Sequence, residues 1–446
     1  MYAGTFPPYR VEAITGVPAE LVVKAARLYA KSRPAALMSG MSPTVHHTNG
    51  LQNHRAISAL IGLTGNFDEK GGNYCLPPGW LNQANGLLTR SAEFEQPRGY
   101  ADMAPRIGQD QYPVWCGLEP QAQAMALPFQ IKSGQPYPIK AMIGFGCNHR
   151  MWPGSDAMAE ALQELDFFVQ VELFMTDTTK MADIVLPACS SFERSELKVY
   201  PYPTKHAIWT RPVIEPLGQS RSDIDIICDL ARRIVPDDRL LGSGHESCLD
   251  WILDPSGLSV AELSRHPSGK TLDDLVLPGY RKYEKTGFNT PSGKMELTSV
   301  HLSRAGLEGL PVYAEPMLSP ISTPHVAETY PLILSTGARL PMTVHSRTYR
   351  MPWCQALRPD HMLDINPIDA RSRAIRQGDY VIIATARNQL RVKANLTEIV
   401  PPGVVSIAHG NPAADVNLLI GPDYLDPISG FPGFKSLLCE VAKANG

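Results

Sequence analysis

The sequence lacks an apolar run of membrane-spanning length, and it has few charged residues. A membrane-spanning helix needs about 20 consecutive, mostly apolar residues, and no stretch of the 446 residues reaches that length. The first residues, MYAGTFPPYR, contain no hydrophobic stretch of the signal-peptide kind. Charged residues make up 19% and the net charge is -3. This balance argues against a nucleic-acid partner.

Clustered cysteines are also absent. The chain has 8 cysteines, none spaced as C-x-x-C. Iron–sulfur clusters and structural zinc sites need closely spaced thiolates, and small secreted proteins are held by dense disulfides. The wide spacing of the cysteines therefore favours free thiols. It predicts neither an iron–sulfur cluster nor a protein-held metal within this chain.

What the chain does contain indicates a globular protein of two or three domains. Its length exceeds what one hydrophobic core supports, and 43% of its residues are hydrophobic. The 40 prolines and 35 glycines imply many loops and turns.

The most informative stretch begins with Phe167–Val171, which has the length and composition of a buried strand. Glu172 follows it, then a polar patch with three hydroxyls, Met175–Thr179, and a second apolar run, Ala182–Leu186. Open α/β sheets bind ligands at the carboxyl ends of their strands. A carboxylate there can accept hydrogen bonds from ribose hydroxyls or a guanine edge.

A second interpretation of the same residues is purely structural. Thr176 and Asp177 are ordinary N-cap residues, and Glu172 could be a solvated loop acid. From one strand and one turn alone, capping is the favoured interpretation.

The flanking regions predict a βαβ unit and further helices. Pro138–Gly146 is a hydrophobic strand and Asp156–Leu165 an amphipathic helix, so Phe167 begins a parallel strand. Near the start, helical spacing within Val11–Ser32 has Thr15 as its N-cap. The remaining predicted elements are a strand at Ala35–Met38, a helix at Asn53–Leu63, an edge strand at Ala207–Pro216 and a helix opened by Ser222, with Asp223 compensating its dipole.

The pattern changes after a proline-rich linker, Tyr313–Tyr330. Short β runs separated by turns predict a small barrel; they are Leu332–Ser335, Tyr380–Ala384, Leu390–Ala394 and Val404–Ala408. The predicted fold class is α/β, with Rossmann-like parallel-sheet layers followed by a C-terminal β-barrel. Predicted domains are a partial α/β domain at 1–83, a second α/β region with a less regular insertion at 84–320, and the barrel at 325–446.

Several segments together resemble one enzyme family. FMTDT, four residues and then DIVLPA resemble the FMT-x-T…ADVVLP segment of the molybdenum and tungsten bis-pterin oxidoreductases, the dimethyl sulfoxide reductase family. Further similarities follow in the family's chain order: LTGN at Leu63–Asn66, FNTPSGKMEL at Phe288–Leu297, STGARLPMTVHSR at Ser335–Arg347, and the run from His409 to Lys435. The last region resembles the family's molybdopterin dinucleotide-binding, double-psi-like barrel.

The resemblance implies a set of cofactor-binding residues: Met41, His46, Asn148, Glu172, Thr176, Arg194, Asp223, Thr336, Gly337, Arg339, His345, Ser346, His409, Asn417 and Lys435. Arg339 and Lys435 would face phosphates, and Glu172 and Asp223 would face ribose hydroxyls or guanine N–H groups. We expect these four residues, with Thr176 and Asn417, to line one cleft between the α/β region and the barrel. Taken alone, Lys435 would be a surface lysine and Arg194 part of an exposed ion pair.

The implied function is that of the C-terminal portion of a catalytic subunit. It would bind bis-molybdopterin guanine dinucleotide with molybdenum or tungsten and support oxygen-atom or electron/hydride transfer to a small-molecule substrate. The family's metal ligand and 4Fe–4S cluster would belong to an N-terminal region that precedes Met1. The implied partners are an iron–sulfur electron-transfer subunit or a separate N-terminal half.

Two alternatives remain open: a non-redox hydratase of the same family, and a catalytically inactive cofactor-binding fragment. The substrate and the catalytic residues are not assigned. The candidates for proton transfer are His46, His149 and His345. The sole ground for choosing them is that unperturbed histidines titrate near neutral pH.

Overall fold

The computed structural model describes residues 2–40, 44–74, 105–118, 121–200, 206–237, 240–271, 279–338, 340, 344–357, 359–411 and 413–445. The chain divides into two units by its contacts. The first comprises residues 1–40, 52–81 and 276–312, and the second comprises 41–51, 82–275 and 313–446. No helix among the described residues is both long and apolar enough to span a membrane.

The first unit is built from helices and loops. Its helices are α1 (Pro8–Thr15), α2 (Ala19–Lys31), most of α4 (Gly50–Leu63), α12 (Tyr283–Thr286) and α13 (Val300–Arg304). The helix predicted at 53–63 is confirmed by α4. Thr15 is not an N-cap: it ends α1, its hydroxyl donates to the Val11 carbonyl, and α2 begins after Pro18.

The strand predicted at Ala35–Met38 is wrong, because its backbone groups bind asparagine side chains instead of a neighbouring strand. The Ala35 N–H donates to Asn66 Oδ1, and the N–H and carbonyl of Leu37 both bond the Asn73 amide. Asn66 belongs to the LTGN segment, so this segment fixes the path of residues 35–37.

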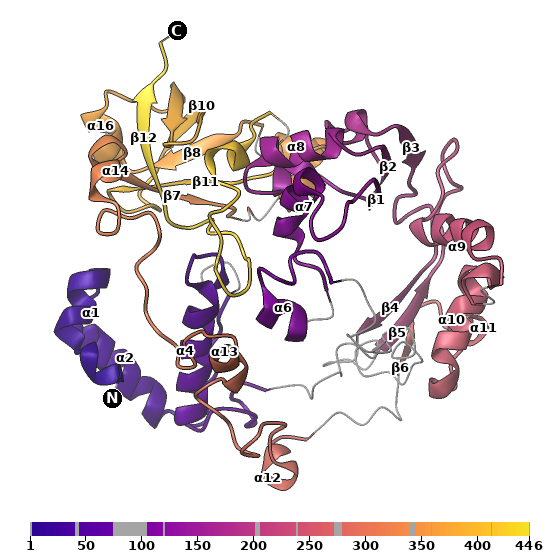
Figure 1. The fold of residues 1–446 in the computed structure, drawn as a ribbon, viewed down its shortest axis with the longest axis horizontal. Coiled ribbons are helices and arrows are strands. Elements are labelled where there is room, and N and C mark those ends of the chain that lie inside the picture. Colours follow the sequence, from indigo (N-terminus) through magenta and orange to yellow (C-terminus); the bar gives the residue numbers. More distant parts are fainter. Residues whose placement is uncertain are drawn as a thin grey trace. The chain divides into compact units, whose positions relative to one another are not determined.

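The second unit's α/β part contains a parallel sheet (Figure 1). Its strand order is β1 (Ala141–Phe145), β2 (Phe167–Glu172), β3 (Ile184–Pro187). Helix α8 (Ser155–Gln163) connects the first two, because parallel neighbours need a crossover connection. Helix α7 (Leu127–Ser133) packs beside α8. Met158, Leu162 and Phe168 form the apolar core between helix and sheet.

Downstream lies an antiparallel sheet with its own core. The sheet consists of β4 (Glu196–Tyr200), β5 (His206–Thr210) and β6 (Lys270–Thr271), and its core includes Trp209 and Leu263. The described helices of the rest of the α/β part are α6 (Pro113–Leu118), α9 (Asp223–Ile234), α10 (His245–Leu253) and α11 (Val260–Ser264). The Ser222 hydroxyl accepts from the Asp225 N–H at the start of α9, as the sequence predicted.

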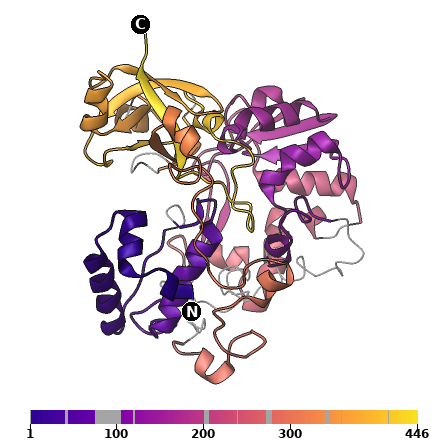
Figure 2. The ribbon, with the colours of Figure 1, turned by 60° about the vertical axis from the view of Figure 1, so that its left-hand side comes forward.

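The C-terminal part is a closed six-stranded barrel (Figure 2). Its strands follow the order β10, β8, β11, β7, β12, β9. Alternate residues point inward, as in a filled barrel: in β9, Val381 and Ile383 are fully buried. The strand bounds are β7 (Leu332–Thr336), β8 (Met362–Ile365), β9 (Tyr380–Ala384), β10 (Gln389–Leu396), β11 (Val404–Ile407) and β12 (Leu437–Lys443), and the associated helices are α14 (Pro324–Thr329), α15 (Pro352–Leu357) and α16 (Pro367–Ser372).

Short 3-10 helices connect these elements, and some of them carry site residues. They are η1 (Tyr2–Thr5), η4 (Ala124–Ala126), η5 (His149–Met151), η6 (Thr179–Met181), η7 (Leu241–Ser243), η8 (Asp254–Ser256), η9 (His345–Arg347) and η10 (Val416–Leu419). The structure confirms the predicted fold class of α/β layers followed by a β-barrel. The predicted domain boundaries stay a prediction.

Candidate functional site

A cavity of about 500 Å³ lies at the carboxyl ends of β1, β2 and β3. Parallel strands place their carboxyl ends, and the loops that follow them, along one edge of the sheet. The barrel part contributes the segment around Ser346 and Gly410 to the same cavity. The predicted residues that line this cavity are Asn148, Glu172, Thr176, Arg194, Asp223 and Ser346.

The acidic and hydroxyl side chains of the cavity are partly engaged by the local backbone. Glu172 Oε1 accepts from the Leu173 N–H at 2.7 Å. Thr176 Oγ1 accepts from the Thr179 N–H at 3.1 Å and lies 2.9 Å from the Thr179 hydroxyl. Asn148 Oδ1 accepts from the Arg150 N–H and caps η5. Thr176 and Asn148 therefore fix the loops after β2 and β1, whatever else they contact.

The cavity also contains four arginines, of which the sequence predicted one. Arg194 donates from Nε to Glu196 Oε1 at 2.8 Å, and its Nη1 lies 3.6 Å from Asp223 Oδ2. Arg347 and Arg350 form no ion pair with the residues that the structure describes. The Arg350 guanidinium lies above the Phe174 ring, 5.6 Å from its centroid.

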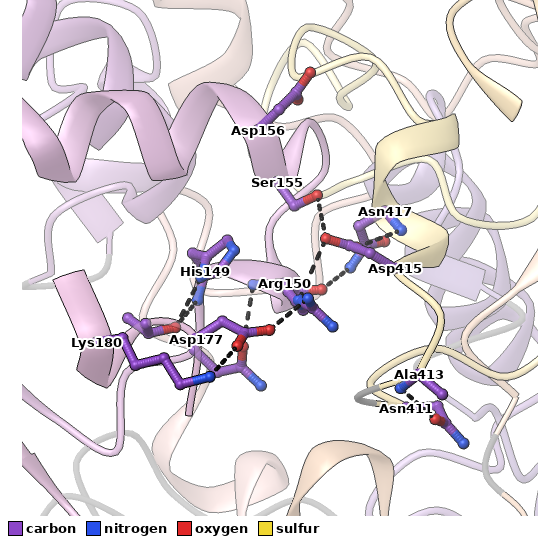
Figure 3. A network of polar contacts seen from close by, with 12 residues as sticks. His149, Arg150, Ser155, Asp156, Asp177, Lys180, Asn411, Ala413, Asp415 and Asn417 are labelled. Carbon is purple, nitrogen blue, oxygen red and sulfur yellow. Dashed lines mark hydrogen bonds and ion pairs between the residues drawn. The ribbon is translucent and has the colours of Figure 1, made fainter. Parts of the chain in front are cut away.

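The fourth arginine, Arg150, joins the sheet to the barrel (Figure 3). Its guanidinium lies 2.5 Å from Asp177, in the loop after β2, and 3.7 Å from Asp415 of the barrel. Asp415 also accepts from the Ser155 hydroxyl, at the start of α8. Burial raises the pKa of Asp415 above its usual range.

Asn417 strengthens the same junction. Its side-chain Nδ2 donates to the Arg150 backbone carbonyl at 2.6 Å, and the backbone carbonyl of Asn417 accepts from the Gly154 N–H. The side chain is fully buried. Asn417 Oδ1 has no hydrogen-bond partner among the described residues. Asn417 does not line the cavity, so the structure places it behind the loop that follows β1.

A second group of predicted residues surrounds His409, next to the cavity. Its neighbours are His345, with ring centroids 4.4 Å apart, and Phe434, at 5.2 Å. His46 also packs against Phe434, with ring centroids 5.1 Å apart. His409 and His345 directly precede Gly410 and Ser346, which line the cavity. The cluster therefore lies beside the wall that the barrel contributes.

The charge state of this histidine cluster follows from burial. Burial, with the nearby His345 and Lys435, lowers the pKa of His409 to about 3. His409 Nδ1 is buried and has no hydrogen-bond partner among the residues described. His409 is therefore neutral at physiological pH and presents an unpaired ring nitrogen.

Two glycines bring the backbone close to this cluster. A Cβ on Gly410, whose φ is 85°, would come within 2.7 Å of the Ser346 nitrogen. A Cβ on Gly337 would come within 3.0 Å of the His409 ring. Lys435 Nζ donates to the Thr336 carbonyl, and the Thr336 hydroxyl donates to the Phe434 carbonyl. Lys435 is half-buried rather than a surface lysine.

Two predicted residues, Met41 and Arg339, lie outside the described residues. The expected common cleft is thus lined by Glu172, Thr176 and Asp223, while Asn417 and Lys435 lie outside its wall. Sequence reasoning missed Arg150, Arg347 and Arg350. Arg347 and Arg350 are three positions apart in the sequence, and this pair of nearby arginines was the signal that could have pointed to an anion site. Among the described residues no three His, Cys, Asp or Glu side chains form a metal-binding group.

The fold and the cavity define an α/β-plus-barrel protein with a cavity at the carboxyl edge of its parallel sheet. Residues 20–233 match the family model described as molybdopterin oxidoreductase. Residues 332–438 match the model described as molydopterin dinucleotide binding domain. The chain belongs to the molybdopterin oxidoreductase family, and its dinucleotide-binding domain indicates a molybdenum or tungsten pterin cofactor.

Curated and solved relatives agree with this assignment. The chain is 26% identical to dopamine dehydroxylase of Eggerthella lenta, over 99% of this chain and 52% of that protein. It is 27% identical to dimethyl sulfoxide reductase DmsA of Escherichia coli, over 90% of this chain and 52% of that protein. The structure of acetylene hydratase from Pelobacter acetylenicus superposes with a TM-score of 0.84 at 23% identity, covering 99% of this chain and 65% of that one. The chain thus spans about half the length of these curated relatives.

Proposed function

We propose that this chain binds molybdopterin guanine dinucleotide in the cavity at the carboxyl ends of β1–β3, as part of a bis-pterin oxidoreductase acting on a small molecule. The observation that carries the proposal is the cavity itself. It gathers hydrogen-bonding and cationic side chains from segments that are far apart in sequence. Its position is the one at which open α/β sheets bind nucleotides.

The residues present fit a pterin dinucleotide. A pyrophosphate needs cations and close backbone approach, and Arg347 and Arg350 offer guanidinium groups that no described carboxylate neutralises. Gly410 also lines the cavity, and its missing Cβ lets this segment pack against the Ser346 backbone beside the two arginines. The unpaired His409 Nδ1 offers a polar atom to a heterocycle.

Each group would have a defined task. Arg347 and Arg350, which line the cavity, would hold the phosphates, and Lys435 would face a phosphate from outside the cavity wall. Glu172 and Asp223 would accept hydrogen bonds from ribose hydroxyls or guanine N–H groups. His409, His345 and His46 would bind the pterin edge, and Asn417 would fix the loop that carries Arg150. When bound, the pterin dithiolenes hold molybdenum or tungsten, and the metal supplies oxygen-atom or electron transfer.

The proposal assigns any iron–sulfur cluster to a part of the enzyme other than this chain. The described cysteines are free thiols, and the eight in the sequence are scattered. Electrons would then reach the pterin site through an iron–sulfur polypeptide. We also propose that the base of the dinucleotide is guanine and that two pterins hold each metal ion.

Glu172→Ala tests the assignment, with Glu398→Ala as the matched control in an exposed barrel loop. Loss of a charge-assisted hydrogen bond costs about 1.5–3 kcal/mol, so we expect Glu172→Ala to weaken binding of guanosine diphosphate roughly tenfold or more. Isothermal titration calorimetry of the purified chain measures this directly. Equal affinities in both variants would leave Glu172 as a solvated acid at the end of a strand.

A further inference from the structure

Arg150 presents its side chain to the cavity from a backbone that is fixed on both sides. The preceding residue of η5, His149, is tied to the loop after β2: its N–H donates to the Thr178 hydroxyl, and its ring Nδ1 lies 2.8 Å from the same oxygen. The Arg150 carbonyl accepts from the Asn417 side chain. These bonds hold the η5 backbone independently of what the guanidinium contacts.

The guanidinium is held by two carboxylates, each of which also has another partner (Figure 3). Asp177 Oδ2 lies 2.5 Å from Arg150 Nη2, and Asp177 Oδ1 accepts from Lys180 Nζ at 3.2 Å. Asp415 Oδ2 lies 3.7 Å from Arg150 Nε and accepts from the Ser155 hydroxyl at 2.8 Å. Both carboxylates therefore keep a hydrogen bond if the guanidinium moves away.

The contact with Asp177 is the one that an incoming anion can replace. The Asp177 side chain is 46% exposed, and exposed ion pairs contribute little to stability. A phosphate carries more negative charge than a carboxylate, and it can accept two parallel hydrogen bonds from a guanidinium. Arg150 and Asp177 both line the cavity. A phosphate that enters the cavity therefore competes with Asp177 for Arg150.

We propose that Arg150 is a further anion-binding residue of the cavity, which Asp177 holds until a ligand binds and which then pairs with a phosphate oxygen of that ligand, while Lys180 stays with Asp177. This role rests on the proposed function, because it requires a ligand with phosphates. Asp177 is then a competitor inside the cavity, and it lowers the affinity of the cavity for anions. Arg347 and Arg350 differ from Arg150 in this respect, because no described carboxylate holds them.

A purely structural role for Arg150 leads to a different expectation. If Arg150 only tied the loop after β2 to the barrel, removing the charge of Asp177 would loosen that tie and would not improve ligand binding. If Arg150 is instead released to the ligand, removing the same charge frees the guanidinium in advance. A gain in affinity that depends on Arg150 therefore distinguishes the two roles.

The test is isothermal titration calorimetry of the complete chain with guanosine diphosphate. Asp177→Asn keeps the shape of the side chain, and we expect it to tighten binding about fivefold. In the Arg150→Gln background the same substitution should change the affinity less than twofold. Guanosine, which has no phosphate, should show a smaller gain. Asp166→Asn is the matched control, because it opens an exposed ion pair with Lys140 outside the cavity lining.

Lys180→Gln provides a second measurement that leaves Arg150 in place. Lys180 is exposed and does not line the cavity. Without it Asp177 retains Arg150 more strongly, so guanosine diphosphate should bind about twofold more weakly, and only while Asp177 is present.

Three results would overturn the assignment of Arg150. They are a gain from Asp177→Asn that is equal with and without Arg150, no gain at all, and an effect of Lys180→Gln that persists in Asp177→Asn. Each of these leaves the proposed function intact, provided that the unmodified chain binds guanosine diphosphate. If the unmodified chain does not bind it, the proposed function fails and the assignment of Arg150 fails with it.

Discussion

At the residue scale, the charge of the cavity depends on Arg347 and Arg350, which no described carboxylate neutralises. If they hold phosphates, Arg350→Gln removes a charge-assisted hydrogen bond of about 1.5–3 kcal/mol. We expect guanosine diphosphate to bind roughly tenfold more weakly, with a smaller dependence on salt. Calorimetry at two salt concentrations measures both effects.

Arg371→Gln is the control for this prediction, because Arg371 is exposed on α16, away from the cavity lining. It should bind as the unmodified chain does. If Arg350→Gln and Arg371→Gln behaved alike, Arg350 would have no role beyond its contact with Phe174.

His409 gives a prediction for the pH dependence of stability. Its pKa is about 3 in the folded protein against an ordinary value of 6.5, mainly because of burial. Between these pH values the unfolded chain binds more protons, so the free energy of unfolding falls as the pH drops from about 6.5 towards 3. His409→Gln should reduce that fall by up to about 1.4 kcal/mol per pH unit.

Urea unfolding at about pH 6 and pH 5 measures the difference for the cofactor-free protein. His325→Gln, at an exposed position in α14, should keep the original slope. An unchanged slope in His409→Gln would mean that other buried histidines, such as His149, dominate acid sensitivity. Burial lowers the pKa of His149 as well.

At this scale, the sequence predicted the position of a residue where that residue adjoins a predictable strand or helix. Glu172 and Asp223 follow or open strong elements, so their positions at the sheet edge were predictable from periodicity. Arg150 and Arg350 were not, because their positions in the cavity depend on how the barrel meets the sheet. Asn417 was assigned by resemblance, and its contact with the Arg150 carbonyl could not be read from sequence spacing.

At the scale of elements, η5 and η10 meet through Asn417, Arg150 and Asp415. Asn417→Ala leaves the Arg150 carbonyl without this donor in a buried site, at a cost of about 1–3 kcal/mol. We expect a lower melting temperature, by about 2–4 °C per kcal/mol for a domain of 150 to 250 residues. Faster hydrogen exchange should be confined to the segment around Gly154.

Asn411→Ala is the matched control, since among the described residues the Asn411 side chain accepts one hydrogen bond, from the nearby Ala413 N–H (Figure 3). Its effect should stay within about 0.5 kcal/mol, as for most surface substitutions. A loss of stability in Asn411→Ala equal to that in Asn417→Ala would contradict the assignment of the junction to Asn417.

The elements were predicted well where apolar runs were long. β1, β2, β3 and α4 follow the predicted segments because periodicity and burial agree there. β8 and β12 were missed, since each gains its partners only by closing the barrel. The false strand at 35–38 shows the converse: an apolar run whose hydrogen bonds go to Asn66 and Asn73 forms no ladder.

At the scale of the whole molecule, the scattered cysteines predict metal content. We expect this chain, purified alone and without oxygen, to contain neither stoichiometric iron nor molybdenum held by a protein ligand, because a cluster needs neighbouring thiolates. Elemental analysis and visible absorbance measure both. Stoichiometric iron with cluster absorbance would contradict the prediction, and a heat-precipitated sample of the same preparation serves as the blank.

The position of β12 has a consequence for the order of events during synthesis. β12 pairs with both β7 and β9 and so closes the barrel. Until residues 437–443 leave the ribosome, β7 and β9 are unpaired edges that can associate with other strands. His409 and Lys435 also take their places only around the closed barrel. If His409 and Lys435 contact the cofactor as proposed, we expect cofactor loading to follow translation of this region. We also expect a nascent chain stalled before Leu437 to be prone to association through these edges.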